Sequence, residues 1–161
     1  MVTYHSDLTV RFRDLSAQLL HGSDTNPLKT FYPNPLPSLT IDLLALLADP
    51  TVASHTTPKL LEEAHIVSSH LAPQSLECAI VLRSGEVAVF RLNSPQPGGA
   101  TVPQILEDPE LISAAHISTI RGRYFYPAFI LVPSRGPASA LALSDIGQMI
   151  MYLASLLFYL S

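Results

Sequence analysis

The sequence predicts a mostly β chain, with about two WD40-like, blade-like meanders of an incomplete β-propeller, proline-rich loops and one or two short helices. A strand–turn–strand pattern recurs three times, over residues 4–15, 80–92 and 150–161. The turns of the three copies align at Leu8, Gly85 and Ser155. Long insertions separate the copies, and a hairpin that recurs between long insertions is typical of an array of neighbouring sheets.

The first region, residues 1–21, is predicted as a partial hairpin. Val10 and Phe12 alternate with polar residues along its second strand, which indicates a strand with one buried face. The proline-rich region that follows, residues 22–63, is predicted as an insertion, because proline cannot donate to a β-ladder and disfavours helix in its predecessor. Within it, the apolar run 39–47 has an ambiguous period and is predicted as a short strand or a short helix: its length and its start favour a strand, whereas its end, rich in Leu and Ala, favours a helix.

The second half is predicted as two meanders joined by a linker. Residues 64–92 form the first meander, after one or two helical turns over residues 59–64. Residues 93–123 are the linker, and 124–161 the second meander, truncated at its end. The aromatic run that opens this second meander contains Pro127, which places it at a sheet edge or just before a bulge. The predicted strands are 66–71, 76–82, 86–92, 139–143, 148–153 and 156–160.

Composition narrows the function classes. The chain has 161 residues, of which 48% are apolar and 14% charged, and its net charge is −4. The richest basic cluster holds only Arg121 and Arg123, so nucleic acid is not an expected partner. Cys78 is the only cysteine, which excludes an internal disulfide. The N-terminus has no basic start followed by an apolar run, so no signal peptide is expected and a cytoplasmic location is predicted.

The most suggestive group of chemical side chains is Glu62, Glu63, His65 and His70. The two histidines are five residues apart, whereas two imidazoles that bind one metal from a helix are four apart. Surface carboxylates and histidines on a solvated strand are therefore the preferred interpretation, and no metal site is predicted.

Three further candidates receive structural interpretations. Gly98 and Gly99 precede no convincing helix, so a flexible linker is favoured over a phosphate-binding loop. Cys78 lies in an apolar strand and is expected to be a packed, inert thiol. Asp145 falls in a turn, where it is expected to accept hydrogen bonds from backbone amides. No catalytic, cofactor-binding or metal-binding residue is predicted, and the chain is expected not to be an enzyme.

The opening hairpin approaches the WD-type strand D-G-T-V-x-F-W-D, with Asp7, Thr9, Val10, Phe12 and Asp14 in place. Four strings carry a wider resemblance: HSDLTVRFRDLSAQLL, LAPQSLECAIVLRSGEVAVFRL, DPELISAAHI and PAFILVPSRGPASALALSDIG. Together they resemble the lethal giant larvae / tomosyn family, especially its fungal members.

This resemblance implies a WD-type protein with β-propellers that regulates polarised exocytosis. It implies SNARE proteins as partners, with a Rab-type GTPase or an exocyst component as further partners, and peripheral association with the plasma membrane. The function expected from it is a non-catalytic protein-binding scaffold linked to exocytosis and cell polarity. No family contact residue can be matched to a position in this chain.

The chain departs from the family pattern. Leu8 replaces the glycine that a tight hairpin turn prefers, Arg13 replaces a tryptophan, and the last strand, LLFYLS, lacks its aspartate. These departures and the number of meanders lead us to expect part of a larger protein. The sheets at its two ends would then expose apolar faces. If five or six residues on each of these faces were left in contact with water, the free energy of unfolding would be lower by on the order of 10 kcal/mol.

Two alternatives to the scaffold remain. Residues 138–160 contain only one charge, Asp145, and could form a C-terminal membrane anchor, although the fully uncharged stretch is shorter than the roughly 20 residues of a spanning helix. A small hydrolase is the other alternative, and no constellation of residues supports it.

Overall fold

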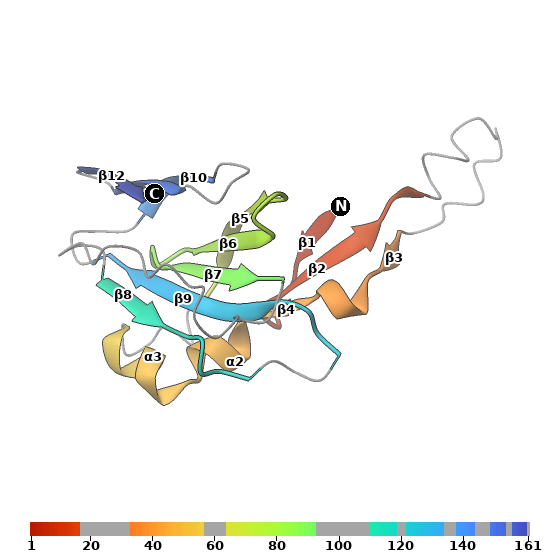
Figure 1. Ribbon diagram of the computed structural model, residues 1–161, viewed down its shortest axis with the longest axis horizontal. Helices are drawn as coiled ribbons and strands as arrows, with labels where there is room; N and C mark the ends of the chain where they lie inside the picture. Colours follow the sequence, from red (N-terminus) through yellow and green to blue (C-terminus); the bar gives the residue numbers. More distant parts are fainter. Residues whose placement is uncertain are drawn as a thin grey trace.

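The computed structural model of the protein describes residues 1–16, 33–56, 64–92, 110–118, 122–133, 138–143, 149–153 and 156–160. This part of the chain is mostly β, as predicted. It forms three antiparallel sheets, with two short α-helices and one 3-10 turn beside them (Figure 1). The predicted helix over residues 59–64 lies, except for its last residue, outside the described residues, and so does most of the proline-rich loop that follows the first hairpin.

The first sheet contains the predicted N-terminal hairpin. Its strands are β1 (Val2–Tyr4), β2 (Thr9–Asp14), β3 (Asn34–Pro35) and β4 (Ile41–Asp42), and β3 and β4 both pair with β2. Leu8 occupies the position in the turn where glycine was expected and has a φ of +59°. Gly85, its predicted counterpart in the next hairpin, also has a positive φ, of +104°. The predicted alignment of these two turns is therefore confirmed, whereas Ser155 lies outside the described residues.

The apolar run 39–47 forms both of the elements that its two ends favoured. The 3-10 turn η1 (Pro37–Leu39) ends at the first residue of this run, β4 comes next, and the helix α2 (Leu43–Leu47) follows at once. Asp42 ends the strand and starts the helix, because its carboxylate accepts a hydrogen bond from the amide of Leu44. A second helix, α3 (Pro50–His55), was not predicted.

The second sheet has the order β5-β6-β7-β9-β8. The strands of the predicted first meander are β5 (Ile66–Ala72), β6 (Glu77–Leu82) and β7 (Val87–Arg91), close to their expected bounds. Their neighbours in the sheet are β8 (Glu110–Ser113) and β9 (Tyr126–Val132).

Two predictions about the second sheet need correction. Residues 93–123 were expected to be a linker, but β8 lies within them. The run that contains Pro127 was assigned to the second meander, but as β9 it pairs with β7 on one side and β8 on the other, so it is no edge strand. The bulge was correctly expected: Phe90 pairs with Pro127 and Val89 with Phe129, so that Ala128 has no partner in β7.

The third sheet is a meander of β10 (Ala138–Leu143), β11 (Met149–Leu153) and β12 (Leu156–Leu160), as predicted for the last strands. The residues assigned to a membrane anchor in the alternative prediction thus form strands where the structure describes them, and not one helix. None of the helices in the described part of the chain is long and apolar enough to cross a membrane.

Nearly all residues of β6 and β7 are buried. Because successive side chains of a strand point to opposite faces, the second sheet is buried on both of its faces. One face joins a cluster with residues of the first sheet and the helices, including Val10, Leu43 and Val52. The other face, with Val81 and Val87, forms a cluster that contains Leu141 of β10. The second sheet therefore lies between the part of the chain that precedes it and the sheet that follows it (Figure 1).

The first strands of the three sheets lie on the same side of the molecule. The amide of Ser69 in β5 donates a hydrogen bond to the Tyr4 hydroxyl of β1 at 3.0 Å, and β10 lies against β5 and β6. The outer face of the first sheet is polar, as the alternation along β2 predicted, which contradicts the apolar open face expected at this end of an incomplete propeller. Arg11 hydrogen-bonds Thr9, and Arg13 hydrogen-bonds Thr3, across this face.

Candidate functional site

Two of the four side chains considered as a metal site, His65 and His70, lie in the described part of the chain. His65 is exposed just before β5, and His70 lies within β5, whereas Glu62 and Glu63 are outside the described residues. Gly98, Gly99 and Asp145 are outside them as well. Among the residues that the structure does describe, no three side chains of the kinds that bind metals are grouped.

Cys78 is fully buried in β6, as its apolar context predicted. Desolvation raises the pKa of this thiol to about 12, because burial disfavours the charged thiolate. Only the thiolate is a strong nucleophile, so Cys78 at this position packs against its neighbours and is unreactive at neutral pH.

The WD-type string of the first hairpin forms a hydrogen-bonded turn. The carboxylate of Asp7 accepts from the amide of Thr9 at 3.1 Å, from its hydroxyl at 2.6 Å, and from Arg11 at 2.6 Å. The hydrogen bond from the Thr9 side chain lowers the pKa of Asp7, against a smaller opposing effect of burial, and the Thr9 amide and Arg11 add to the lowering. All these partners are local, so the network fixes the turn.

Two hydroxyl–imidazole pairs were not singled out from the sequence. Ser68 Oγ lies 3.2 Å from His70 Nε2, and Thr3 Oγ1 lies 3.0 Å from His5 Nε2, each pair at the two-residue spacing of a strand face. A serine nucleophile also needs its base oriented by a third group and donors that stabilise an oxyanion. Within the described part of the chain neither imidazole is bonded to a carboxylate, so the pairs do not reach the geometry of a hydrolase site.

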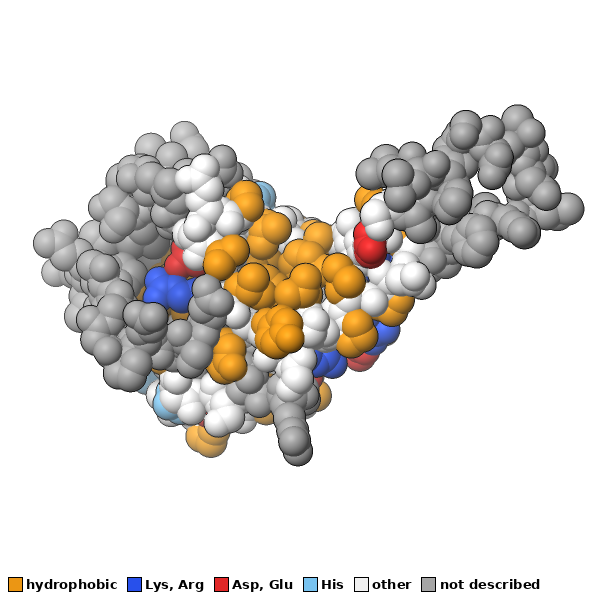
Figure 2. Space-filling view, turned by 45° about the vertical axis from the view of Figure 1, so that its right-hand side comes forward, with side chains coloured by type: hydrophobic (Ala, Val, Ile, Leu, Met, Phe, Trp, Pro, Cys, Tyr) orange, Lys and Arg blue, Asp and Glu red, His pale blue; other side chains and the backbone are white. Residues whose placement is uncertain are grey.

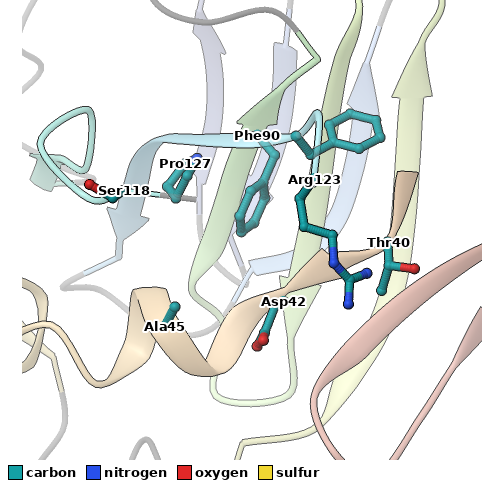
Figure 3. Close-up of a pocket in the computed structure, with 8 residues that line it drawn as sticks. Thr40, Asp42, Ala45, Phe90, Ser118, Arg123 and Pro127 are labelled. Carbon is teal, nitrogen blue, oxygen red and sulfur yellow. The ribbon is translucent and has the colours of Figure 1, made fainter. Parts of the chain in front are cut away.

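A shallow hollow lies where the start of β9 meets β4 and α2 (Figure 3). Its empty volume is about 300 Å³, part of which is open solvent. Arg123 on its rim donates to the Pro37 carbonyl at 2.9 Å, and Asp42 is already bonded to the amide of Leu44. The opposite charges of Arg123 and Asp42 cancel, so the hollow has no preference for an ion of one sign. It is lined by Thr40, Asp42, Ala45, Phe90, Ser118, Arg123, Phe125 and Pro127.

Exposed apolar side chains of β1 and β5 form the most distinctive described surface. Val2 and Tyr4 are 37% and 44% exposed, and Val67 and Leu71 are 58% and 48% exposed. Tyr4 hydrogen-bonds Ser69, which shares one face of β5 with Leu71, and Val67 lies at the bulge between Ile66 and Ser68; we group these four exposed apolar residues under one name, the β1–β5 patch. Figure 2 turns the side of the N-terminal hairpin forward and shows hydrophobic side chains gathered over that face.

The β1–β5 patch was not predicted, although part of its signal was in the sequence. Val2 and Tyr4 alternate along β1 as the residues of a buried strand do. They are exposed because β1 is the edge strand of its sheet, and β5 is the edge strand of the next. Exposed apolar groups of this kind are typical of surfaces that bind other proteins.

The arrangement therefore offers a surface for protein contact, and no set of groups poised for acid–base or nucleophilic chemistry among the described residues. Searches of family models, of curated proteins and of solved structures gave no match to this chain.

Proposed function

We propose that the chain is part of a WD-type β-propeller and acts as a non-catalytic scaffold that binds proteins of SNARE-dependent exocytosis. In this proposal it regulates exocytosis and cell polarity in the cytoplasm, with peripheral association at the plasma membrane. Plasma-membrane SNAREs are the first partners to test, and a Rab-type GTPase or an exocyst component the next. The partner classes come from the sequence resemblance to the lethal giant larvae / tomosyn family.

One structural observation carries the scaffold part of the proposal. The sheet β5–β9 is covered on one face by the earlier part of the chain and on the other by β10, which begins the following sheet. Successive blades of a propeller cover one another in this way, since each sheet buries both its faces against its neighbours. The first strands of the three sheets also lie together, as the inner strands of blades do.

The β1–β5 patch is the surface that we assign to partner binding. Its four residues are uncharged, and Val67 and Leu71 are about half exposed. A SNARE helix has one apolar face, and such a face buries apolar area when it lies in a hydrophobic groove of its partner. Val67 and Leu71 would then lose most of their exposure on binding, at about 25 cal/mol for each Å² of apolar surface removed from water.

A binding assay tests the proposal. The 161-residue chain is titrated against immobilised cytosolic segments of plasma-membrane SNAREs, with circular dichroism to verify the fold. We expect saturable binding that the double substitution Val67→Ser and Leu71→Ser weakens about tenfold, in the range of interface truncations. Leu44→Ser is the matched control, because Leu44 is as exposed as Leu71, at 48%, but lies on α2. A folded chain that binds no SNARE, GTPase or exocyst component contradicts the proposal.

A further inference from the structure

The strand β12 is an edge of the third sheet. The order of this sheet is β10-β11-β12, so β12 pairs with β11 on one side, and no other strand of the described part of the chain pairs with it. The other edge strand, β10, lies against β5 and β6 of the second sheet (Figure 1). An edge strand presents unpaired amides and carbonyls, which are able to pair with a strand of another chain.

The other edge strands that the structure describes carry features that oppose such pairing. Strand β3 contains Pro35, and β1 and β4 have only three and two residues. Strand β8 is short, begins with Glu110 and has α3 packed beside it. In β5 the amide of Ser69 is already bonded to the Tyr4 hydroxyl. Short strands, prolines, charged side chains and covering elements are the means by which proteins block the edges of their sheets.

Strand β12 has none of these blocking features in its sequence. Its five residues, Leu-Leu-Phe-Tyr-Leu, include neither a charge nor a proline, and residues 146–161 contain no Asp, Glu, Lys or Arg. Like charges that lie directly opposite each other destabilise a pair of strands, so a charged edge strand repels its own copy. An uncharged strand does not, and β12 is therefore compatible with a second β12.

The pairing of β11 with β12 identifies the backbone groups that face the open edge. Leu153 pairs with Leu156, so two residues connect the strands, and the pair that closes such a hairpin exchanges hydrogen bonds. Hydrogen-bonded and non-hydrogen-bonded pairs alternate along an antiparallel ladder. The backbone groups of Phe158 therefore bond to β11, whereas those of Leu157 and Tyr159 point away from it.

The second sheet shows how a strand is added at the equivalent position. Strands β5, β6 and β7 form an antiparallel meander, as β10, β11 and β12 do. On the side of β7 that corresponds to the open side of β12, the strand β9 is paired antiparallel to β7. An antiparallel neighbour is thus the expected addition to β12, and antiparallel pairing of two identical strands has two-fold symmetry.

We propose that two copies of the 161-residue chain associate by antiparallel pairing of their β12 strands, which joins their third sheets into one continuous sheet. A two-fold axis at Phe158 places Leu157 of each copy opposite Tyr159 of the other, in pairs that exchange hydrogen bonds. Each copy uses the one open side of its β12, so association ends at the dimer and does not continue as a filament. This interface is distinct from the β1–β5 patch, so the inference goes beyond the proposed function.

Sedimentation equilibrium of the 161-residue chain, over a wide range of concentration, tests this inference. We expect a reversible equilibrium between the monomer and a species with twice the 17.5 kDa mass of one chain. A chain that stays monomeric at every concentration, or that forms polymers without a dimer, overturns the inference.

A proline at the open edge removes the pairing groups without breaking the sheet itself. Tyr159→Pro deletes an amide that faces away from β11, where an edge strand tolerates proline. The lost hydrogen bond occurs once in each copy, so dimerisation is expected to weaken about tenfold or more. An unchanged dimerisation constant in this variant contradicts the pairing of β12.

Charge substitutions test both the register and the place of the interface. Leu157→Lys with Tyr159→Lys puts like charges opposite each other and should abolish the dimer, as should Leu157→Glu with Tyr159→Glu. An equimolar mixture of the two variants puts opposite charges in register and should restore a dimer that contains one copy of each. The matched control, Val67→Lys with Leu71→Lys, adds the same charge to the β1–β5 patch and should leave the dimer unchanged.

Three results of these charge substitutions overturn the inference. They are a dimer that survives in either β12 variant alone, a dimer that is lost in the control, and a mixture that stays monomeric although circular dichroism shows both β12 variants to be folded.

Discussion

The left-handed conformation of Leu8 leads to an unusual prediction about glycine. Leu8 has a φ of +59° but is only 8% exposed, and its side chain belongs to the cluster between the first sheet and the second. Its carbonyl accepts a hydrogen bond from the amide of Leu43 at 3.1 Å, which holds the turn against the start of α2. The burial of this side chain stabilises the fold, whereas its backbone conformation destabilises it.

Substitution separates these two effects. Leu8→Ala removes the buried side chain but keeps a Cβ in the left-handed region, so it is expected to lower the free energy of unfolding by about 2–4 kcal/mol. Leu8→Gly loses the same side chain but relieves a backbone strain of about 1–2 kcal/mol, which exceeds the entropic cost of glycine of about 0.5–1 kcal/mol. We therefore expect the glycine variant to be more stable than the alanine variant by about 0.5–1 kcal/mol.

Urea denaturation of the 161-residue chain measures both variants. Val10 is the control, because it is fully buried in the neighbouring strand and is not among the residues with a positive φ. At Val10 the ordinary order should hold, with the glycine variant about 0.5–1 kcal/mol less stable than the alanine variant. If Leu8→Gly is also less stable than Leu8→Ala, the left-handed turn at Leu8 is refuted.

Three further outcomes follow from the described contacts. Because burial raises the pKa of Cys78, this thiol should react with alkylating reagents only when the chain unfolds; rapid labelling of the native chain would contradict its position. The ionised Asp7 carboxylate should stabilise the fold above its ordinary pKa of 3.8, and this stabilisation should be lost as the pH falls through its lowered pKa. Asp7→Asn should remove this dependence on pH, which is measured as the free energy of unfolding at a series of acidic pH values. Leu141→Ala should cost about 2–4 kcal/mol in thermal unfolding if β10 packs on the second sheet, whereas Leu44→Ala, at an exposed site, should cost less than about 0.5 kcal/mol.

Local patterns in the sequence predicted the hairpins, because strand alternation and turn residues act over a few positions. The strands on either side of Gly85 were predicted for this reason. For the run 39–47 a strand and a helix were alternatives, and the structure has a short strand followed by a helix. The pairing of β9 with β7 was not, since it joins segments separated by more than thirty residues and no short-range signal specifies it. The helix α3 was missed although the pair Asp49–Pro50 is a typical helix start.

The surface features were harder to predict than the strands. An apolar residue on a strand has the same pattern whether its strand is central or at an edge, so the exposure of Tyr4 and Leu71 could not be read from the sequence. The histidine–carboxylate contacts His55–Glu110 and His116–Asp49 depend on how α3 packs against β8, and no local sequence pattern specifies that packing. The polar outer face of the first sheet was predicted, because Arg11 and Arg13 alternate with Val10 and Phe12 along β2.

The position of the second sheet between two others is measured most directly by nuclear Overhauser contacts between methyl groups. We expect the methyl groups of Leu141 to show cross-peaks to Val81 or Val87 on one face of that sheet, and those of Val10 or Leu43 to show them to Ile80 on the other. Cross-peaks from Leu141 to Ile80 in place of Val81 and Val87, or none from Leu141 to β6 and β7, would contradict the stacked arrangement and with it the scaffold.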